Sequence, residues 1–497
     1  MQTLSYQTLA QTGYRGYLLP SAPEKVLQFG EGNFLRAFVD YWFDLANEKV
    51  GWNGKCCLVQ PIAPGLAKQI NAQQGLYTLY LRGRQNGEKI DQKRVISSVS
   101  RCLNPYEKEG YEAMMAVAVS DDLEYIVSNT TEAGIVYDPA CQPEDCPPAS
   151  FPAKLTQVLY ARYGAGKPGV VILSCELIDN NGKELLKCVN RYIDQWNLGD
   201  GFRIWVNERC LFCSTLVDRI VPGRIRDAGE AARLDAENGY HDELIDVGEI
   251  FGVWNIEGPA WLADKLPFKA AGLNCPVVPD VTPYKKRKVR ILNGAHTSTV
   301  LAAYLAGYDI VMDFMKDDTI RSFMNTVIYD EVIPTLDLPK EELEDFAAAV
   351  NDRFANPYIK HKLLDIALNS CSKFNARCLP SLLGYVEEKG ELPKCLTFSL
   401  AAFIRFYKGQ MNDGVCTGVR KDGTQYQIRD DADVLTFFAE IWTCNDADKI
   451  AGAALSNTSF WSGKDLTQIP GLKDAVAGYL KRMDTEDIRS IMTELIG

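Results

Sequence analysis

Apolar and polar positions alternate along the first half of the chain in a pattern that predicts strands and helices in turn. Short apolar runs typical of buried strands lie at 25–29, 55–60, 124–128 and 169–174. Helical spacing of apolar residues is found between them at 34–47, 111–118 and 151–163. A strand at 76–81 followed by Asn86-Gly87 predicts a hairpin added to the same sheet. This alternation predicts a parallel, doubly wound sheet.

The pattern changes after about residue 275, where the proline-rich stretch 274–283 predicts a rigid connector. Helical periodicity dominates beyond it, at 320–333, 343–354, 363–368, 396–408, 434–442 and 484–495. A chain of 497 residues is too long for one ordinary core. We therefore expect an α/β domain over residues 1–275 and a mainly α-helical domain over residues 276–497.

Composition and charge narrow the classes of partner. Apolar residues make up 46% and charged residues 24% of the chain, as in soluble globular proteins. The net charge of −12 argues against a nucleic-acid or anionic-membrane partner. Because neither a signal-peptide pattern nor an apolar stretch of about 18 residues occurs, we expect a cytoplasmic protein. The fifteen cysteines are scattered, which predicts mostly reduced, buried thiols.

The most informative polar pattern is Lys288-Val-Arg-Ile-Leu-Asn293-Gly-Ala-His296. If this stretch is α-helical, at about 100° per residue, the three named side chains fall within an arc of about 140°. Thr282 as N-cap and Pro283 at the first helical position favour a helix. Buried surroundings and neighbouring positive charges favour a neutral lysine amine, so Lys288 is a candidate general base.

The alternative interpretation of this stretch is a solvated cluster of positive charge at a helix start. The scarcity of histidine argues against it, because His296 is one of only three in the chain. The stretch would open the second domain, where we expect a cleft between domains.

A glycine-rich turn follows the first predicted strand. Gly30-Glu31-Gly32 lacks the third glycine of the dinucleotide fingerprint, with Leu35 in its place. Glycines there let the backbone approach a pyrophosphate at a helix N-terminus. The predicted cofactor contacts from this region are Phe29, Gly30, Gly32, Asn33, Phe34 and Arg36, the last as a charge contact.

Two further loops are candidates for the cofactor. Gln60 ends the second strand, where NAD enzymes carry an acidic residue, and it is a candidate to bind the ribose. This position leaves NAD or NADP open. Asn129, Thr130 and Glu132 follow the strand at 124–128, where the nicotinamide end is expected, although a simple polar turn is an equal alternative.

Seven motifs together resemble the long-chain mannitol dehydrogenase family. They are FGEGNFLRAF at 29–38, SNTTEAG at 128–134, FPAKL at 151–155, SCELIDNNG at 174–182, VDRIVP at 217–222, KVRILNGAH at 288–296 and RFANPYI at 353–359. The resemblance implies a Rossmann-type dinucleotide-binding domain followed by a mainly α-helical substrate domain. It also implies metal-independent hydride transfer with NAD(H). The motifs are most similar to those of members that act on sugar acids, and the alternative is a sister enzyme that acts on a different sugar acid or on a polyol.

The resemblance assigns roles to single residues. Lys288 matches the general base, Asn293 an oxyanion-stabilising amide and His296 a residue that orients substrate oxygens. Asp218 and Lys373 match positions that line the substrate pocket. The candidates for binding a substrate carboxylate are Lys373, Arg353 and Arg290, and the sequence does not rank them. The family's second oxyanion amide falls on Leu177, with Asn180 and Asn181 as candidate substitutes. The sequence is consistent with a monomer or a small homo-oligomer.

Overall fold

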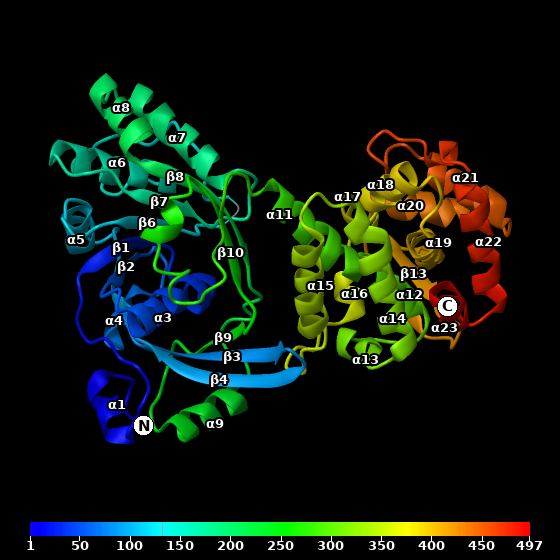
Figure 1. Cartoon of the computed structure of the whole chain (residues 1–497), viewed down its shortest axis with the longest axis horizontal. Coiled ribbons are helices and arrows are strands. Elements are labelled where there is room, and N and C mark those ends of the chain that lie inside the picture. The colour runs from blue at the N-terminus through cyan, green and yellow to red at the C-terminus, as the bar shows by residue number, and fades with distance from the viewer. Residues whose placement is uncertain (132) are drawn as a thin grey trace. The chain divides into compact units, whose positions relative to one another are not determined.

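The computed structural model describes residues 1–131 and 133–497, which form two compact units. The first unit comprises Met1–Arg82 and Ile90–Val281, and the second comprises Gly83–Lys89 and Thr282–Gly497 (Figure 1). Across the described ranges, no helix has both the length and the apolar character needed to cross a bilayer.

An eight-stranded sheet forms the centre of the first unit, in the order β11-β10-β8-β7-β6-β1-β2-β5. Its strands are β1 (Glu24–Phe29), β2 (Lys55–Val59), β5 (Val99–Leu103), β6 (Tyr125–Ser128), β7 (Val171–Ser174), β8 (Leu211–Asp218), β10 (Val253–Glu257) and β11 (Val277–Val278). The six neighbouring strands β5-β2-β1-β6-β7-β8 pair in parallel, whereas β10 runs antiparallel to β8. Counted along the chain, the six parallel strands have the order 3-2-1-4-5-6 of the Rossmann fold. The predicted doubly wound sheet is confirmed.

Helices cover both faces of this sheet because successive side chains of a strand point to opposite sides. On one face, Val26 of β1 packs in a core with α3 (Tyr41–Val50) and α4 (Ala67–Ala72). On the other face, Leu27 and Phe29 pack with α5 (Lys108–Ala118), α6 (Phe151–Gly164), α7 (Asn181–Gln195) and α8 (Asp200–Arg209). Burial on both faces explains why these strands are continuous apolar runs in the sequence. Further helices of this unit are α1 (Tyr6–Thr12), α2 (Asn33–Leu35), α9 (Ala228–Asn238) and α10 (Leu262–Lys265).

The predicted hairpin is present, but it belongs to a different sheet. Strands β3 (Tyr77–Gln85) and β4 (Glu88–Ile96) flank Asn86 and Gly87, which both have positive φ, at 52° and 78°. Two such residues form the type I′ turn that suits a two-residue hairpin. The hairpin pairs with β9 (Asp246–Glu249) in a three-stranded sheet of order β4-β3-β9. Its predicted addition to the main sheet was therefore wrong, because an alternating pattern does not specify the partner strand.

The second unit is mainly helical, as predicted. Its elements are α11 (Thr282–Arg287), η2 (Lys288–Asn293), α12 (Gly294–Leu305), α13 (Val311–Met315), α14 (Asp318–Thr326), η3 (Val327–Val332), η4 (Ile333–Thr335), α15 (Lys340–Phe354), α16 (Leu363–Ile366), α17 (Ser370–Arg377), α18 (Leu379–Lys389), α19 (Lys394–Phe406), α20 (Ala432–Ile441), α21 (Ala447–Ser456), η5 (Leu466–Gln468), α22 (Leu472–Thr485) and α23 (Ile488–Ile496). Every residue of α12 from Thr297 to Leu305 is buried, so this helix lies at the centre of the unit. The short antiparallel sheet β12 (Gly409–Asn412), β13 (Val415–Val419) and β14 (Gln425–Ile428) was not predicted.

Three stretches of the described chain are π-helical, with hydrogen bonds that span five residues instead of four. They are η1 (Arg36–Asp40), between α2 and α3, then η2 and η3. The π-helix is rare and occurs frequently at functional sites. The segments η1 and η2 coincide with the glycine-turn helix and with the Lys288 stretch, the two regions that the sequence analysis selected.

Candidate functional site

The glycine turn after β1 combines a tight backbone position with an open one. Gly30 has φ of 120°, and a Cβ there would lie 2.8 Å from the backbone oxygen of Asn129. Only glycine fits this position without displacing backbone. Gly32 precedes the helix that begins at Asn33, and a Cβ built on it would meet no atom within 4 Å. The helix N-terminus at Gly32 therefore faces open space, as a pyrophosphate site requires.

The turn lies where the strand order of the sheet reverses. Strands β2 and β6 flank β1 on opposite sides, and the N–H of Asn129, just after β6, donates to the carbonyl of Phe29 at 3.0 Å. Ligands of doubly wound sheets bind at this switch point. Asn129 and Thr130 are tied to the end of β7, with Asn129 Nδ2 donating to the Cys175 carbonyl at 2.8 Å. Thr130 donates through its N–H and its hydroxyl to Glu176 Oε1, both at 3.1 Å.

Glu176 was not predicted as a site residue, although it lies within the quoted SCELIDNNG motif. Its carboxylate is buried and also accepts from Ser128 Oγ at 3.1 Å. Burial raises the pKa of Glu176, while these hydrogen bonds lower it. Glu176 thus positions the loop after β6. Glu132, another predicted contact, lies outside the described residues.

A cavity of about 550 Å³ opens beside β2 and β5, at the same edge of the sheet. Its lining comes from the loops and helix starts that follow these two strands, including Gln60, Lys68, Asn71, Asn104 and Glu107. The sequence pattern did not reveal it. The cavity has the size of a small-molecule site.

The Gln60 side chain is hydrogen-bonded to the loop that follows β2, and its predicted contact with a ribose stays a prediction. Its Nε2 donates to the carbonyls of Ile62 and Ala63, at 3.1 and 2.8 Å, and its Oε1 accepts from the N–H of Ala67 at 3.3 Å. Both amide hydrogens therefore have protein acceptors. Gln60 shapes the loop at the cavity wall, and its Oε1, which accepts one hydrogen bond there, keeps a second lone pair for a ribose hydroxyl.

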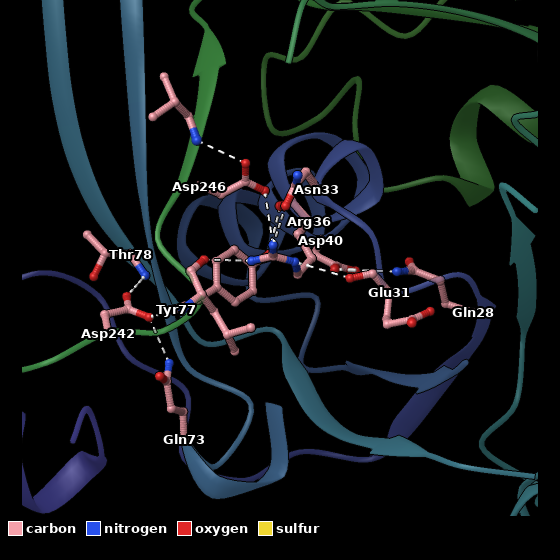
Figure 2. Close-up of polar contacts among 12 residues, drawn as sticks. Gln28, Glu31, Asn33, Arg36, Asp40, Gln73, Tyr77, Thr78, Asp242 and Asp246 are labelled. Atoms are coloured by element: carbon pink, nitrogen blue, oxygen red, sulfur yellow. Dashed lines mark hydrogen bonds and ion pairs between the residues drawn. The ribbon is translucent and has the colours of Figure 1, made fainter. Parts of the chain in front are cut away.

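Arg36 also departs from its prediction, because its guanidinium is buried (Figure 2). Its Nε donates to the Glu31 carbonyl at 3.2 Å and its Nη1 to the Leu244 carbonyl at 2.7 Å. Its Nη2 donates to Asn33 Oδ1 at 2.6 Å and lies 3.7 Å from Asp246 Oδ2. Arg36 therefore ties the glycine turn to β9 and to the loop before it. A side chain only 2% exposed is not a surface contact for phosphate.

The two aromatic candidates of this region pack inside the protein. Phe29 is fully buried, with its ring 5.0 Å from that of Phe151. Phe34 is half-buried, with its ring 5.5 Å from that of Phe38. Both side chains hold the turn against the sheet, and any contact of theirs with a cofactor would involve backbone or ring edges.

Leu177 occupies the position at which the family resemblance places a second oxyanion amide. Its side chain is apolar and 64% exposed, on the loop after β7. Asn181 is buried, and its amide bonds to the backbone of Glu176, Gly182 and Thr215. Asn180 is exposed in a left-handed conformation with φ of 55°. Of the two candidate substitutes, Asn180 alone keeps an exposed amide. Asp218 ends β8 in the first unit and is buried.

In the second unit, the Lys288 stretch is one continuous helix through α11, η2 and α12. It differs from the prediction in being π-helical from Lys288 to Asn293. Because π-helical hydrogen bonds run between residues five apart, Lys288 and Asn293 lie one turn apart on one side of the helix. The α-helical spacing assumed from sequence would have separated them by about 140°. The wide turn therefore brings the two side chains closer to a common face.

Asn293 and His296 are predicted site residues whose side-chain polar atoms have no hydrogen-bond partner among the described residues. Both are half-buried. The His296 ring stacks on Phe354 at 3.8 Å with an interplanar angle of 4°, and His361 lies edge-on at 5.5 Å. Burial lowers the pKa of His296 well below its usual value, and the positive charges of neighbouring residues add to this effect. His296 is thus a neutral imidazole held in a fixed plane.

The charges that act on His296 come from His361, Arg377, Arg353 and Lys373. Lys373 lies on α17 and donates to the Ile366 carbonyl at 2.9 Å. Arg353, at the end of α15, is buried. Arg290 donates to Ser381 Oγ at 3.0 Å. Arg377 was not predicted, although it follows Lys373 by one helical turn. The second unit thus surrounds His296 with positive charge, an environment suited to an acidic ligand.

Comparison with known proteins places this arrangement in a family. Residues 24–270 match the model of the mannitol dehydrogenase Rossmann domain, and residues 280–484 match that of the mannitol dehydrogenase C-terminal domain. The altronate oxidoreductase of Klebsiella pneumoniae is 44% identical over 483 residues, which cover 95% of this chain and 97% of that protein. That of Cronobacter sakazakii is 44% identical and covers 98% of this chain and 100% of that protein.

Solved structures show the same fold. A D-sorbitol dehydrogenase in substrate-free form superposes with a TM-score of 0.80 at 21% identity, over 99% of this chain and 100% of that one. A Pseudomonas fluorescens mannitol 2-dehydrogenase, in a ternary complex with NAD and D-mannitol, gives 0.64 at 23% identity, with 99% of each chain covered.

The fold and the two family models define a two-domain dehydrogenase that acts on a CH–OH group. The chain belongs to the mannitol dehydrogenase family. The sequence analysis selected Asp218 in the first unit and Lys288 in the second. Their roles in a substrate site stay predictions.

Proposed function

We propose that the chain interconverts D-altronate and D-tagaturonate with NAD(H), without a metal ion, in the cytoplasm as part of hexuronate breakdown. The near full-length identity to altronate oxidoreductases supports this proposal. The observation that carries it is the positive charge around His296, where neither Lys373 nor Arg377 forms an ion pair with a carboxylate of the described residues. A neutral polyol would leave these cations without a counter-charge, whereas a sugar acid supplies one.

The first unit suits a dinucleotide in two respects. Gly32 leaves room for a pyrophosphate at a helix N-terminus, and the cavity beside β2 and β5 lies at the same edge of the sheet. The backbone around the switch point comes from the loops after β1 and β6, at Gly30, Asn33, Asn129 and Thr130. Bound NAD(H) would supply the hydride acceptor or donor for the substrate carbon.

The chain's own residues handle the proton and the developing charge. In reduction, the Lys288 ammonium donates a proton to the ketone oxygen as that oxygen gains negative charge. The Asn293 amide donates a hydrogen bond to the same oxygen and stabilises the alkoxide. In oxidation, the neutral amine of Lys288 accepts the hydroxyl proton. These two groups supply the proton transfer and oxyanion stabilisation that a metal ion supplies in other dehydrogenases.

His296 acts as a fixed neutral partner for a substrate hydroxyl. A neutral imidazole has one donor and one acceptor nitrogen, so it can orient a hydroxyl without competing with Lys288 for the reacting proton. Stacking on Phe354 sets the plane in which those nitrogens point. Asp218, at the end of β8, is proposed to line the substrate pocket, as the family resemblance implies.

Replacing Lys288 by Ala tests the chemistry. Single-turnover oxidation of bound NADH by D-tagaturonate should slow by about 10²–10⁴-fold, the usual contribution of a general acid or base. NADH affinity, measured by fluorescence titration, should stay unchanged, and an added primary amine should restore part of the rate. Lys286→Ala is the matched control, since Lys286 is exposed and pairs with Asp337. Wild-type turnover by Lys288→Ala would refute the assignment.

A further inference from the structure

Helix α17 carries two positive charges on one face. Lys373 and Arg377 are four residues apart, so their side chains are neighbours on the helix surface. Both are half-buried. Burial lowers the pKa of each, and the charge of Arg377 lowers that of Lys373 further. A like-charged pair at this spacing destabilises a helix slightly, and a bound anion would offset that repulsion.

No protein acid provides that interaction. Within residues 1–131 and 133–497, neither Lys373 nor Arg377 has a carboxylate oxygen within 4.0 Å of its charged nitrogens. Asp430 acts on Lys373 from farther away. Its carboxylate already accepts from the N–H of Cys371 at the start of α17, from the Tyr407 hydroxyl and from the N–H of Asp431.

Two buried arginines of the same unit, Arg287 and Arg420, are each paired with a carboxylate. Arg287 Nη1 lies 2.7 Å from Glu342 Oε1, and Arg420 Nη1 lies 3.1 Å from Asp309 Oδ1. Arg377 makes one long contact, from Nη1 to Thr297 Oγ1 at 3.4 Å. A guanidinium has five N–H donors in a planar fork that matches a carboxylate. Most donors of Arg377 are thus left for a ligand.

The free donors lie beside the reaction residues. Thr297, which Arg377 contacts, directly follows His296, and the Cys378 thiol at the end of α17 lies 3.6 Å from the Gly294 carbonyl. The last turn of α17 therefore packs on the first turn of α12. Arg290 is a weaker candidate, because it already donates to Ser381 and is not among the main charges that act on His296.

We propose that Arg377, with Lys373 one turn before it, binds the carboxylate of the sugar-acid substrate and selects ketouronates over neutral ketoses. This inference rests on the proposed function. The fork of Arg377 forms paired hydrogen bonds with the two carboxylate oxygens, and Lys373 adds a point charge. The ketone lies near the other end of the six-carbon chain, so this contact fixes which carbon meets Lys288.

The test compares kcat/KM for NADH-dependent reduction of D-tagaturonate and of D-fructose, a neutral ketose. Replacing Arg377 by Met should lower kcat/KM for the ketouronate by about 10- to 100-fold, mainly through KM, since hydrogen bonds between charged groups are worth about 1.5–3 kcal/mol. The value for D-fructose should not fall. Arg377→Lys should fall between wild type and Arg377→Met, because it keeps the charge without the fork.

Two further variants complete the design. Lys373→Met should show the same selective loss at smaller size, and it tests the pair independently if Arg377→Met does not fold. Arg321→Met is the matched control, since Arg321 is exposed and pairs with Asp318. Equal losses for both substrates, or an unchanged ketouronate value in Arg377→Met, would overturn the inference.

A binding measurement separates this inference from the proposed function. In calorimetric titrations of the NADH-loaded wild-type enzyme, D-altronate should bind, and in Arg377→Met its affinity should fall at least tenfold. If the wild type reduces D-fructose but neither binds nor turns over the sugar acids, the proposed function fails. If the wild type prefers the sugar acids and Arg377→Met keeps that preference, only the inference fails.

Discussion

Arg36 in the first unit and Arg377 in the second differ in how many partners their guanidinium groups have within their own unit. In the first unit, Arg36 opens the π-helical segment η1, and its guanidinium is directed at two carbonyls, at Asn33 and at Asp246 (Figure 2). In the second unit, α17 contacts the π-helical segment η2, and among the residues that the structure describes Arg377 has one long hydrogen bond and no carboxylate within 4.0 Å. A cation whose donors all have partners in the chain holds the fold together. A cation whose donors are free marks a place for a ligand.

The largest expected difference between variants of the two arginines is in the free energy of unfolding. Arg36→Met leaves Asp246 buried without its cation, which should cost about 3–5 kcal/mol of unfolding free energy. Arg377→Met removes a like-charge neighbour of Lys373 and should change stability by no more than about 0.5 kcal/mol. Urea unfolding followed by tryptophan fluorescence checks both. A loss in Arg377→Met as large as that in Arg36→Met would show that Arg377 is a fold residue.

The Arg36 cluster also contains a buried carboxyl without a close ion pair, and its pH dependence sharpens the comparison. Burial raises the pKa of Asp40 to about 7, so the folded state keeps a proton that the unfolded chain releases near pH 4. Stability from this group is present at low pH and is lost as pH rises toward 7. Asp40→Asn cannot titrate.

The unfolding free energy of Asp40→Asn relative to wild type should therefore rise by up to about 4 kcal/mol between pH 4 and pH 8. Urea unfolding of both proteins at intervals across this range provides the measurement. A constant difference between the two proteins would mean that Asp40 has the same pKa in the folded and unfolded chains.

Gly30 and Gly32 of the turn after β1 offer the same contrast between a position that the fold requires and a position left open for a ligand. Gly30→Ala should cost about 1–3 kcal/mol of stability, because its φ and the nearby Asn129 carbonyl exclude a side chain. Gly32→Ala should change stability by less than about 1 kcal/mol, since its Cβ meets only open space. Its NADH affinity should nevertheless fall about tenfold or more, because the methyl group occupies the approach to a pyrophosphate. Wild-type NADH affinity in Gly32→Ala would place the cofactor elsewhere.

Much of the fold followed from the apolar pattern. Strands β1, β2, β6 and β7 are buried on both faces, so they are continuous apolar runs bounded by turns. The sheet β12–β13–β14 was missed because its strands are short and largely exposed. The π-helical turn at Lys288 was also invisible, since a change of one residue per turn is too small to alter a pattern over six residues.

The candidate site was predictable where local spacing determines it. Lys288, Asn293 and His296 lie on one helix, so their offsets could be read from the sequence, whereas their catalytic roles stay predictions. The burial of Arg36 could not be read from the sequence, because its partners Leu244 and Asp246 lie more than 200 residues farther along the chain. Arg377 carried a usable signal, four residues after Lys373 on a helix, which the pattern did not distinguish from an ordinary basic helix end.

The most direct measurement is the rate of NADH oxidation with D-tagaturonate, D-fructuronate and D-fructose side by side. The account predicts the highest kcat/KM for D-tagaturonate. The kcat/KM for D-fructose should be lower by at least about 10- to 100-fold, because only the sugar acids supply a carboxylate to Arg377 and Lys373. Reduction of D-fructose as efficient as that of D-tagaturonate would contradict it.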